Sequence, residues 1–148
     1  EFVPEAMNKH IDLGVEVPEH PVYVMGQTLM LSEMLKNLVE NALRYTPEGG
    51  CVTVRVDDGP QRGAVALEVE DDGPGIPIGE RKLVFDRFYR VLGTNQDGSG
   101  LGLAIVQETA TQHKATVDIE NNPRASQAGR PGTVMRVSFA PLHSVVEE

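Results

Sequence analysis

Two glycine-rich stretches constrain this chain more than any other feature of its sequence. Residues 71–77 read Asp-Asp-Gly-Pro-Gly-Ile-Pro, and residues 98–103 read Gly-Ser-Gly-Leu-Gly-Leu. A single glycine run is most often a turn, but here the first run follows an alternating apolar stretch and the second opens a helical one. Glycine lets the backbone approach a ligand closely, and the N–H groups at a helix N-terminus suit phosphate. Because the Asp71 carboxylate can accept a hydrogen bond from an exocyclic amine such as that of adenine, the two runs together predict a nucleotide site.

The composition is that of one acidic globular domain. The chain has 148 residues, a net charge of -9 and a single cysteine, so we expect one domain over residues 1–148, no disulfide framework and a reducing compartment. The scattered arginines form no basic patch, which argues against nucleic-acid binding. No apolar run reaches the ~18 residues that a membrane-spanning helix needs, and no signal peptide opens the chain. We therefore expect a cytoplasmic domain that is not inserted in a membrane.

Hydrophobic periodicity predicts a mixture of helices and strands. Helical spacing of apolar residues predicts a long helix over 27–46 and a second one over 99–112, with Ser99 as its N-cap. Cys51 stands at the start of a strand, where we expect a small core residue. Alternation predicts strands at 51–57, 64–70, 116–120 and 133–139, the first two as an antiparallel hairpin, together with a hairpin of two short strands over 15–24 and a helical turn at 4–10.

The long helix carries a polar stripe beside its apolar one. At 100° per residue, this stripe lies roughly 90° from the apolar side chains, at the edge of the core. The stripe is either a solvated flank or a functional surface, because asparagine is a mediocre helix former whose amide can bind Mg²⁺ or phosphate. Its members are Glu33, Asn37, Asn41 and Arg44.

Residues 77–98 have little core signal and lie between the two glycine runs, which indicates a lid. We expect a short helix from Glu80 to Tyr89 within it. Phe85 and Phe88 would share one face of that helix, as ordinary packing or as a movable anchor. Arg87 and Arg90 are either solvent charges or phosphate contacts.

Four sequence boxes in order identify the family that this chain resembles. With their order and spacing, the chain resembles the catalytic ATP-binding domain of bacterial two-component sensor histidine kinases, in the superfamily of gyrase, Hsp90-type chaperones and MutL. The resemblance covers roughly residues 5–140. The boxes are an asparagine box at 33–46, a glycine box at 71–77, a phenylalanine box at 85–90 and a second glycine box at 98–104.

The resemblance implies a two-layer α/β (α+β) sandwich with an ATP lid. A mixed, mostly antiparallel sheet of about five strands would pack under three helices. The helices and strands expected from periodicity agree with that fold.

The resemblance also implies ATP and Mg²⁺ as cofactors, with roles for the asparagine box. Asn41 would coordinate the Mg²⁺ that bridges the phosphates, and Asn37 would support the phosphates. Arg44 would add positive charge there, and Tyr45 would lie near the ribose and base. Glu33, one turn before Asn37, would position water or metal.

The other boxes would surround the base, the phosphates and the lid. Asp71 would accept a hydrogen bond from the adenine amine, with Ile76 packing on the base and Thr133 binding adenine through water. The lid and partner contacts would be Phe85, Phe88 and Arg90. The remaining ATP-binding positions would be Gly73, Gly75, Arg87, Gly98, Gly100, Leu101, Gly102 and Leu103.

Two positions depart from the family pattern. Gly26-Gln27 stands where Gly-Asp is common, and residues 113–115 read His-Lys-Ala where His-Gly-Gly is usual. The second departure requires a turn without glycine. We expect neither to abolish ATP binding.

The implied function is donation of the γ-phosphate of Mg²⁺-ATP to a histidine on a separate dimerisation and phosphoacceptor domain, with a response regulator downstream. The whole protein would be an inner-membrane sensor. None of the four histidines lies before an acidic residue on a long helical hairpin, so we expect the ATP-holding half alone, monomeric by itself. The alternatives are a superfamily ATPase, an anti-sigma-type serine kinase and a module that binds ATP as a regulatory ligand. An ATPase needs a glutamate base, and neither Glu33 nor Glu40 is clearly placed for it.

Overall fold

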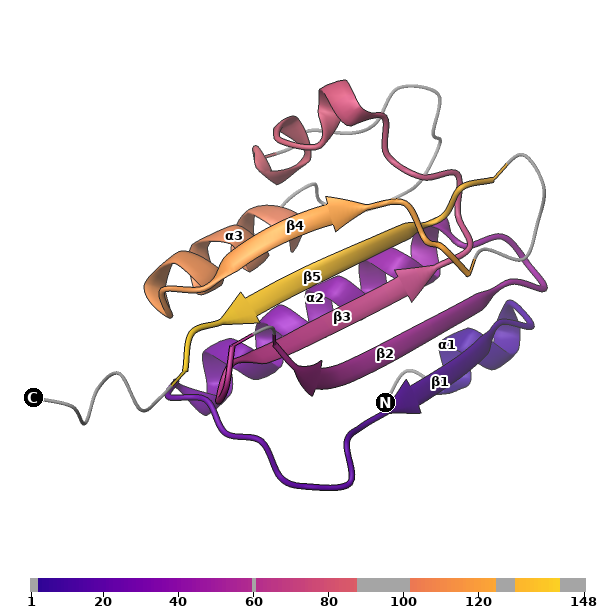
Figure 1. The fold of residues 1–148 in the computed structure, drawn as a ribbon. Helices are drawn as coiled ribbons and strands as arrows, with labels where there is room; N and C mark the ends of the chain where they lie inside the picture. Colours follow the sequence, from indigo (N-terminus) through magenta and orange to yellow (C-terminus); the bar gives the residue numbers. More distant parts are fainter. Residues whose placement is uncertain (1–2, 60, 88–101, 125–129, 142–148) are drawn as a thin grey trace, which may run out of the picture.

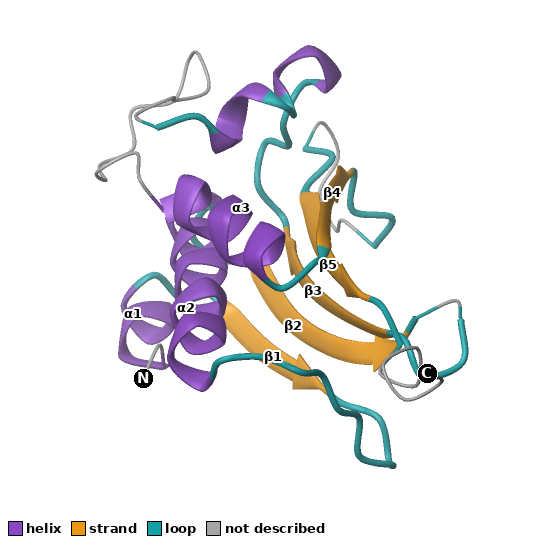
Figure 2. Ribbon diagram, turned by 90° about the vertical axis from the view of Figure 1, so that its left-hand side faces the viewer, coloured by secondary structure: helices purple, strands orange, loops and turns teal. Residues whose placement is uncertain are grey.

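The computed structural model describes residues 3–59, 61–87, 102–124 and 130–141. They form two layers, with a five-stranded sheet on one side and the α-helices on the other (Figures 1 and 2). The predicted α/β sandwich is therefore confirmed. Within these ranges, no helix combines the length and the apolar character that crossing a bilayer requires.

The sheet has the strand order β1-β2-β3-β5-β4. β1 runs parallel to β2, and every other pair of neighbours is antiparallel, so the sheet is mixed and mostly antiparallel as predicted. Asp71, the last residue of β3, lies opposite Thr133, the first residue of β5. The strands are β1 (Asp12–Glu16), β2 (Cys51–Asp58), β3 (Val65–Asp71), β4 (Thr116–Glu120) and β5 (Thr133–Phe139).

The helices are α1 (Val3–Asn8), α2 (Thr28–Tyr45) and α3 (Gly102–Gln112). α2 and α3 pack against each other on one face of the sheet (Figure 2). The C-terminal end of α2 is capped by Lys9, whose Nζ donates to the carbonyl oxygens of Leu43 at 2.9 Å and Arg44 at 3.3 Å. A cation at this end satisfies carbonyl groups that have no partner within the helix.

Strand alternation decides which side chains reach the helices. Val54 opposes Val69, which opposes Met135, and all three are buried in the core. Successive side chains of a strand point to opposite faces. Asp71, two residues after Val69, therefore points towards the helix layer together with the core residues.

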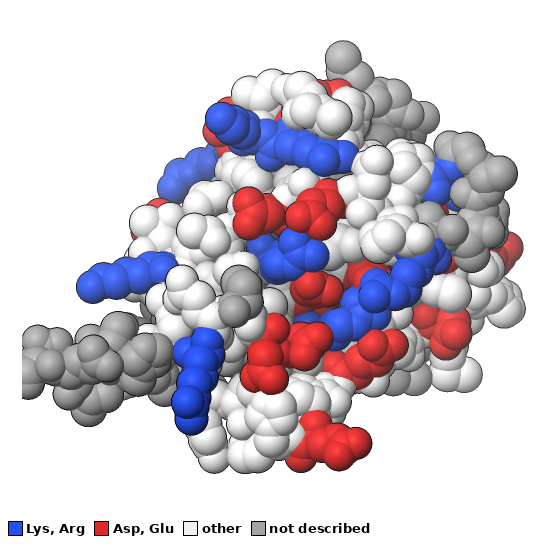
Figure 3. All heavy atoms as spheres, viewed as in Figure 1, with Lys and Arg blue, Asp and Glu red and all other residues white. Residues whose placement is uncertain are grey.

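The opposite face of the sheet is covered by ion pairs. Arg55 on β2 pairs with glutamates of β1 and β3, and Arg136 on β5 pairs with glutamates of β3 and β4. Acidic and basic side chains interleave over the face seen in Figure 3. The glutamates in these pairs are Glu16, Glu68, Glu70 and Glu120.

The predicted hairpin over residues 15–24 is wrong. β1 ends at Glu16 and pairs with β2, some 39 positions further along the chain, as Glu16 opposite Arg55 shows. Residues 17–27 form no strand. Pro18 and Pro21 have no N–H to donate to a ladder, whereas the free edge of β2 offers β1 a full set of partners.

Two further predictions are wrong. In the described part of 80–89 there is no α-helix, and the chain forms two short 3-10 turns, Ile78–Glu80 and Leu83–Phe85. Asp86 is extended and ends the second turn. Cys51 is exposed and is not a core residue, because on β2 it alternates with the buried Val52 and faces away from the helices.

The turn without glycine after α3 forms at Lys114. This residue adopts a left-handed backbone conformation, with φ at 57°. The turn is held by the Ala115 N–H, which donates to the carbonyl of Ala110 at 2.8 Å. The departure from the family pattern is therefore accommodated by a lysine in a conformation that favours glycine.

Candidate nucleotide-binding site

The carboxyl of Asp71 is buried at the end of β3, where the residue is only 6% exposed. Its Oδ1 accepts a hydrogen bond from the main-chain N–H of Gly73 at 2.8 Å. The main-chain N–H of Thr133 also donates to this carboxyl. Within the described ranges no basic side chain forms an ion pair with it.

Burial raises the pKa of Asp71 to about 7, and the nearby Asp72 carboxylate adds to this rise, although the bonds from Gly73 and Thr133 lower the pKa. The charged form of the carboxyl is therefore costly in the free protein. A ligand that donates a hydrogen bond to it would stabilise the charge. The neighbouring Asp72 is also buried, and its Oδ2 accepts a hydrogen bond from the main-chain N–H of Cys51 at 2.9 Å.

Glycines after Asp71 allow a tight turn against two other segments. A Cβ on Gly73 would lie 2.9 Å from the carbonyl oxygen of Tyr45, at the end of α2. Gly75 has a φ of 79°, and a Cβ there would lie 2.7 Å from Cγ of Pro131. Neither position can take a side chain without displacing its neighbours. The first glycine box therefore packs between the end of α2 and the loop that precedes β5.

The asparagine box and the second glycine box meet where α2 and α3 pack. A Cβ on Gly102 would lie 3.1 Å from Oδ1 of Asn37. The side-chain NH₂ of Asn37 donates to the carbonyl oxygen of Glu33 at 2.9 Å, so its amide oxygen is on the α3 side. Asn37 and Tyr45 are eight residues apart, or about 12 Å along the helix. The α2 helix thus joins the Asp71 region to the second glycine box over a distance comparable to the length of a nucleoside triphosphate.

The other predicted site residues of the described part differ in their exposure and contacts. Asn41 and Arg44 are half-buried on α2, and Glu33 is exposed with its carboxylate 4.0 Å from Nζ of Lys36. Ile76 and Leu103 pack against the core cluster. Phe85 is half-buried and Arg87 is exposed. The predicted residues Phe88, Arg90, Gly98, Ser99, Gly100 and Leu101 lie outside the described residues.

Two residues near the site were not predicted from the sequence. Thr46, directly after α2, is fully buried, and its hydroxyl has no hydrogen-bond partner within the described part of the protein. Arg81 donates through Nε to the carbonyl oxygen of Ile76 at 2.9 Å and through Nη2 to Oδ1 of Asn121 at 2.7 Å. Arg81 thereby fastens the chain after the first glycine box to the end of β4. A lone threonine or arginine carries no sequence signal for such roles.

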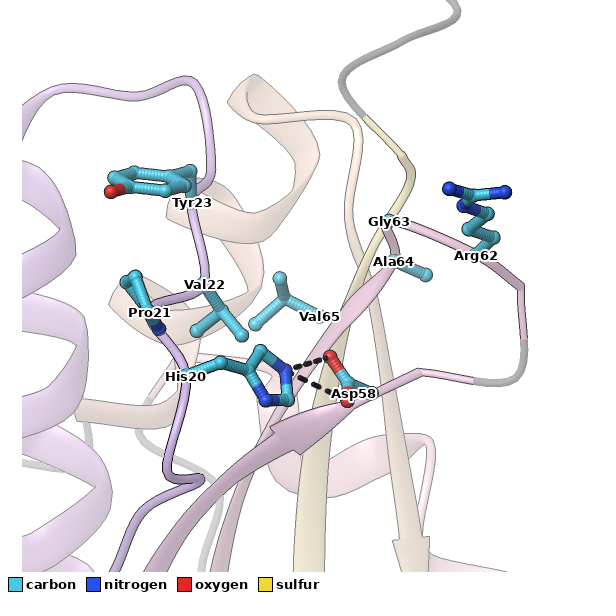
Figure 4. A pocket seen from close by; sticks show the side chains of 9 residues that line it. All are labelled: His20, Pro21, Val22, Tyr23, Asp58, Arg62, Gly63, Ala64 and Val65. Carbon is cyan, nitrogen blue, oxygen red and sulfur yellow. Dashed lines mark hydrogen bonds and ion pairs between the residues drawn. The ribbon is translucent and has the colours of Figure 1, made fainter.

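A cavity of about 740 Å³ lies elsewhere in the molecule, between residues 20–23 and the turn that joins β2 to β3 (Figure 4). His20 and Asp58 face each other across it with a 3.0 Å contact between Nε2 and Oδ2, and Val22 and Val65 point into it. None of its lining residues is a predicted ATP-binding residue. His20 and Asp58 are already paired with each other, and nothing in the cavity indicates a ligand.

The described residues contain no cluster of three or more His, Cys, Asp or Glu side chains that could hold a metal ion. A magnesium ion shared with a triphosphate does not need such a cluster, because phosphate and water oxygens supply most of its ligands. The half-buried amide of Asn41 is one oxygen donor of suitable type on the α2 face that also carries Asn37. The donor set therefore fits a metal held jointly with a nucleotide.

The fold and the site together define a class. The arrangement is that of an ATP-binding α/β sandwich. It consists of a mixed sheet under helices, a buried aspartate at the end of the central strand, and asparagines of α2 beside α3, which begins with a glycine. The model of the family described as histidine kinase-, DNA gyrase B- and HSP90-like ATPases matches residues 26–143. The chain belongs to this family, and the membership supports ATP binding.

Within this family, the similar proteins are sensor histidine kinases. The sensor protein kinase PmrB of Pseudomonas aeruginosa is 42% identical over 120 residues, which are 80% of this chain and 24% of PmrB. The solved mycobacterial sensor histidine kinase MprB is 34% identical with a TM-score of 0.81, over 94% of this chain and 91% of that one. Full-length ShkA, solved in complex with AMPPNP, is 26% identical with a TM-score of 0.76, over 93% of this chain and 27% of ShkA.

These similarities identify a histidine-kinase catalytic ATP-binding domain, as the four boxes predicted. The chain spans about a quarter of the length of the curated relatives that it matches.

Proposed function

We propose that this domain binds Mg²⁺-ATP and donates the γ-phosphoryl group to a histidine on a separate dimerisation and phosphoacceptor domain in two-component signal transduction. The observation that carries the proposal is the Asp71 carboxyl, which is buried, has a pKa raised to about 7 and is contacted by main-chain N–H groups. The 6-amino group of adenine is a donor that would stabilise its charged form. The AMPPNP complex of ShkA supports a nucleotide in a domain of this fold.

Phosphoryl transfer depends mainly on alignment and on stabilisation of charge. Asp71 would fix the adenine end of ATP. Asn37 lies about 12 Å from Tyr45 along α2 and next to Gly102, the first residue of α3, on the side proposed for the phosphates. Arg44 would add positive charge there. Magnesium, when bound, would neutralise phosphate oxygens, and Asn41 would contribute one ligand. Replacing Asn41 by alanine should therefore weaken the Mg²⁺ dependence of ATP binding.

In the transfer itself, a ring nitrogen of the acceptor histidine would form a bond to the γ-phosphorus as the bond to the β,γ-bridging oxygen breaks, with ADP as the leaving group. A neutral imidazole is already nucleophilic, so this domain need not supply a strong base. Glu33 remains a candidate only for positioning water or metal, because it is exposed and its carboxylate lies near Lys36. Phe85 would contact the partner domain when the lid closes.

The whole protein is proposed to be a membrane sensor whose catalytic domain lies in the cytoplasm and whose phosphoryl group passes to a response regulator. The names of its relatives, a sensor protein kinase and a sensor histidine kinase, support this assignment. By itself, the domain is proposed to be monomeric.

The test is transfer of label from γ-labelled ATP to a supplied phosphoacceptor domain of a sensor histidine kinase. Labelled histidine is expected with this domain and Mg²⁺, and little label with the Asp71→Asn variant at the same subsaturating ATP concentration. Sustained phosphate release without any acceptor would indicate an ATPase instead. ATP binding with neither transfer nor release would indicate a regulatory nucleotide module.

A further inference from the structure

A buried asparagine that belongs to none of the four boxes contacts the strand that carries Asp71. Asn122 is 7% exposed and lies two residues after the end of β4. Its side-chain NH₂ donates to the main-chain carbonyl oxygen of Asp71 at 3.0 Å. The two residues are 51 positions apart in the sequence, so no local pattern links them.

The carbonyl that Asn122 binds lies where the ladder of β3 ends. Another segment crosses it closely, because a Cβ on Gly132 would lie 2.3 Å from this oxygen. A buried carbonyl without a donor is costly, and the Asn122 amide supplies a donor. The peptide that follows Asp71 is therefore held in one orientation. Because this peptide leads to Gly73, whose N–H donates to the Asp71 carboxyl, the same bond holds the carboxyl in place.

Asn122 itself is fixed on three sides. Its main-chain N–H donates to the carbonyl of Pro131 at 3.0 Å, and its Oδ1 accepts from the main-chain N–H of Arg124 at 2.9 Å. The Arg124 side chain pairs with Glu70, which also pairs with Arg55 at 2.5 Å. The residue next to Asp71 in β3 thus anchors the same loop from the opposite face of the sheet.

We propose that Asn122 is a positioning residue for the recognition of 6-aminopurines, which acts by holding the Asp71 carboxyl where the 6-amino group of ATP reaches it. The inference rests on the proposed adenine-binding role of Asp71. It deepens that role, because it assigns part of the base selectivity to a residue that does not contact the base.

The experiment compares binding of ATP with binding of purine riboside 5′-triphosphate, which has the same sugar and phosphates but lacks the 6-amino group. Both dissociation constants are measured by calorimetry with Mg²⁺ at pH 8. The ratio of the two constants isolates the contact with the amino group. Partial unfolding of a variant lowers both affinities by the same factor and leaves the ratio unchanged.

The wild type is expected to prefer ATP about tenfold or more. Asn122→Ala should reduce this preference about fivefold, the effect of one hydrogen bond, with binding of the purine nucleotide changed far less. Asn122→Asp keeps the acceptor for the N–H of Arg124 and removes the donor to Asp71, so it should reduce the preference similarly. Gln112→Ala is the matched control, because the Gln112 side-chain amide donates to Oε2 of Glu108 on the exposed surface of α3, and it should keep the preference of the wild type.

The outcomes separate the two ideas. If the wild type prefers ATP and both Asn122 variants keep that preference in full, the positioning role is overturned while the adenine assignment of Asp71 stands. If the wild type does not distinguish the two nucleotides, the adenine assignment fails and the role of Asn122 fails with it.

Discussion

Replacing Asp71 by asparagine should stabilise the free domain at pH 8 and weaken its binding of ATP. The folded-state pKa of about 7 lies above the ordinary value of 3.8, so the folded protein holds its proton more tightly than the unfolded chain. The stability that this proton provides is fully present below about pH 4 and is lost as the pH rises through about 7. At pH 8 the folded protein therefore contains a carboxylate that would be better solvated in the unfolded chain.

The size of the effect follows from the difference of about 3 pKa units, which amounts to about 4 kcal/mol at pH 8. Asparagine has no charge to desolvate, and its oxygen can still accept from the N–H of Gly73. Its NH₂ group, however, adds a donor to a site where the N–H of Thr133 also requires an acceptor, and this conflict should cost about 1–3 kcal/mol. The variant should then be more stable than the wild type by about 1–3 kcal/mol at pH 8.

The assay is urea unfolding of both proteins at pH 5 and pH 8, with ATP affinity measured by calorimetry at pH 8. Between the two pH values the wild type should lose about 2–3 kcal/mol more stability than Asp71→Asn. ATP affinity should fall about tenfold or more, because a hydrogen bond to a charged acceptor is worth about 1.5–3 kcal/mol. The exposed Asp118→Asn on β4 is the control for loss of one charge and should change neither quantity. Parallel pH profiles for wild type and Asp71→Asn would show that the carboxyl is not desolvated, and unchanged ATP affinity would refute the adenine contact.

Three other perturbations follow from the same geometry. The preference for ATP over purine riboside triphosphate should fall severalfold from pH 8 to pH 6 as Asp71 is protonated, because a neutral acceptor forms a bond about half as strong; a preference that does not change with pH would contradict this. Gly132→Ala should lower the free energy of unfolding by several kcal/mol, since its Cβ would lie 2.3 Å from a main-chain oxygen. The control Gly49→Ala, at a φ of 87° with nothing within 4 Å, should cost only about 1–2 kcal/mol. Equal losses in urea unfolding would argue against the close contact at Gly132. Thr46→Val should stabilise the free domain by about 1 kcal/mol by removing a buried hydroxyl without a partner, and a loss of melting temperature would show that this hydroxyl is bound by water or by the protein.

Local patterns were sufficient to predict most of the fold. Alternation predicted β2, β3, β4 and β5, and helical spacing predicted α2, because each pattern is set by residues within one element. The inward direction of the Asp71 side chain agrees with the same alternation, since Asp71 has the strand parity of Val69, but no pattern predicted that its carboxyl is buried. By contrast, the parallel pairing of β1 with β2 joins Glu16 to Arg55, and no short-range signal decides between that edge and a local hairpin.

The environment that raises the pKa of Asp71 could not be predicted from local sequence patterns. The residues that contact it, or crowd the turn after it, come from the end of α2, the loop after β4 and the start of β5, and only the folded chain brings these segments together. The glycines that follow Asp71 identified it in the sequence. No sequence pattern predicts that Asn122 contacts the Asp71 carbonyl, or that the Thr46 hydroxyl has no hydrogen-bond partner within the described residues. Both depend on burial, which is a property of the packed structure.

The cost of burying Asp71 also links ligand binding to stability. The charged Asp71 destabilises the free domain by about 4 kcal/mol at pH 8. Part of this destabilisation is removed when a ligand donates a hydrogen bond to it, because the bond favours the charged form. Saturating ATP should therefore raise the melting temperature of the wild type more than that of Asp71→Asn at pH 8. At pH 5, where Asp71 is already protonated, the two proteins should differ much less. An equal ATP-induced shift for both proteins at pH 8 would mean that the nucleotide does not contact this carboxyl.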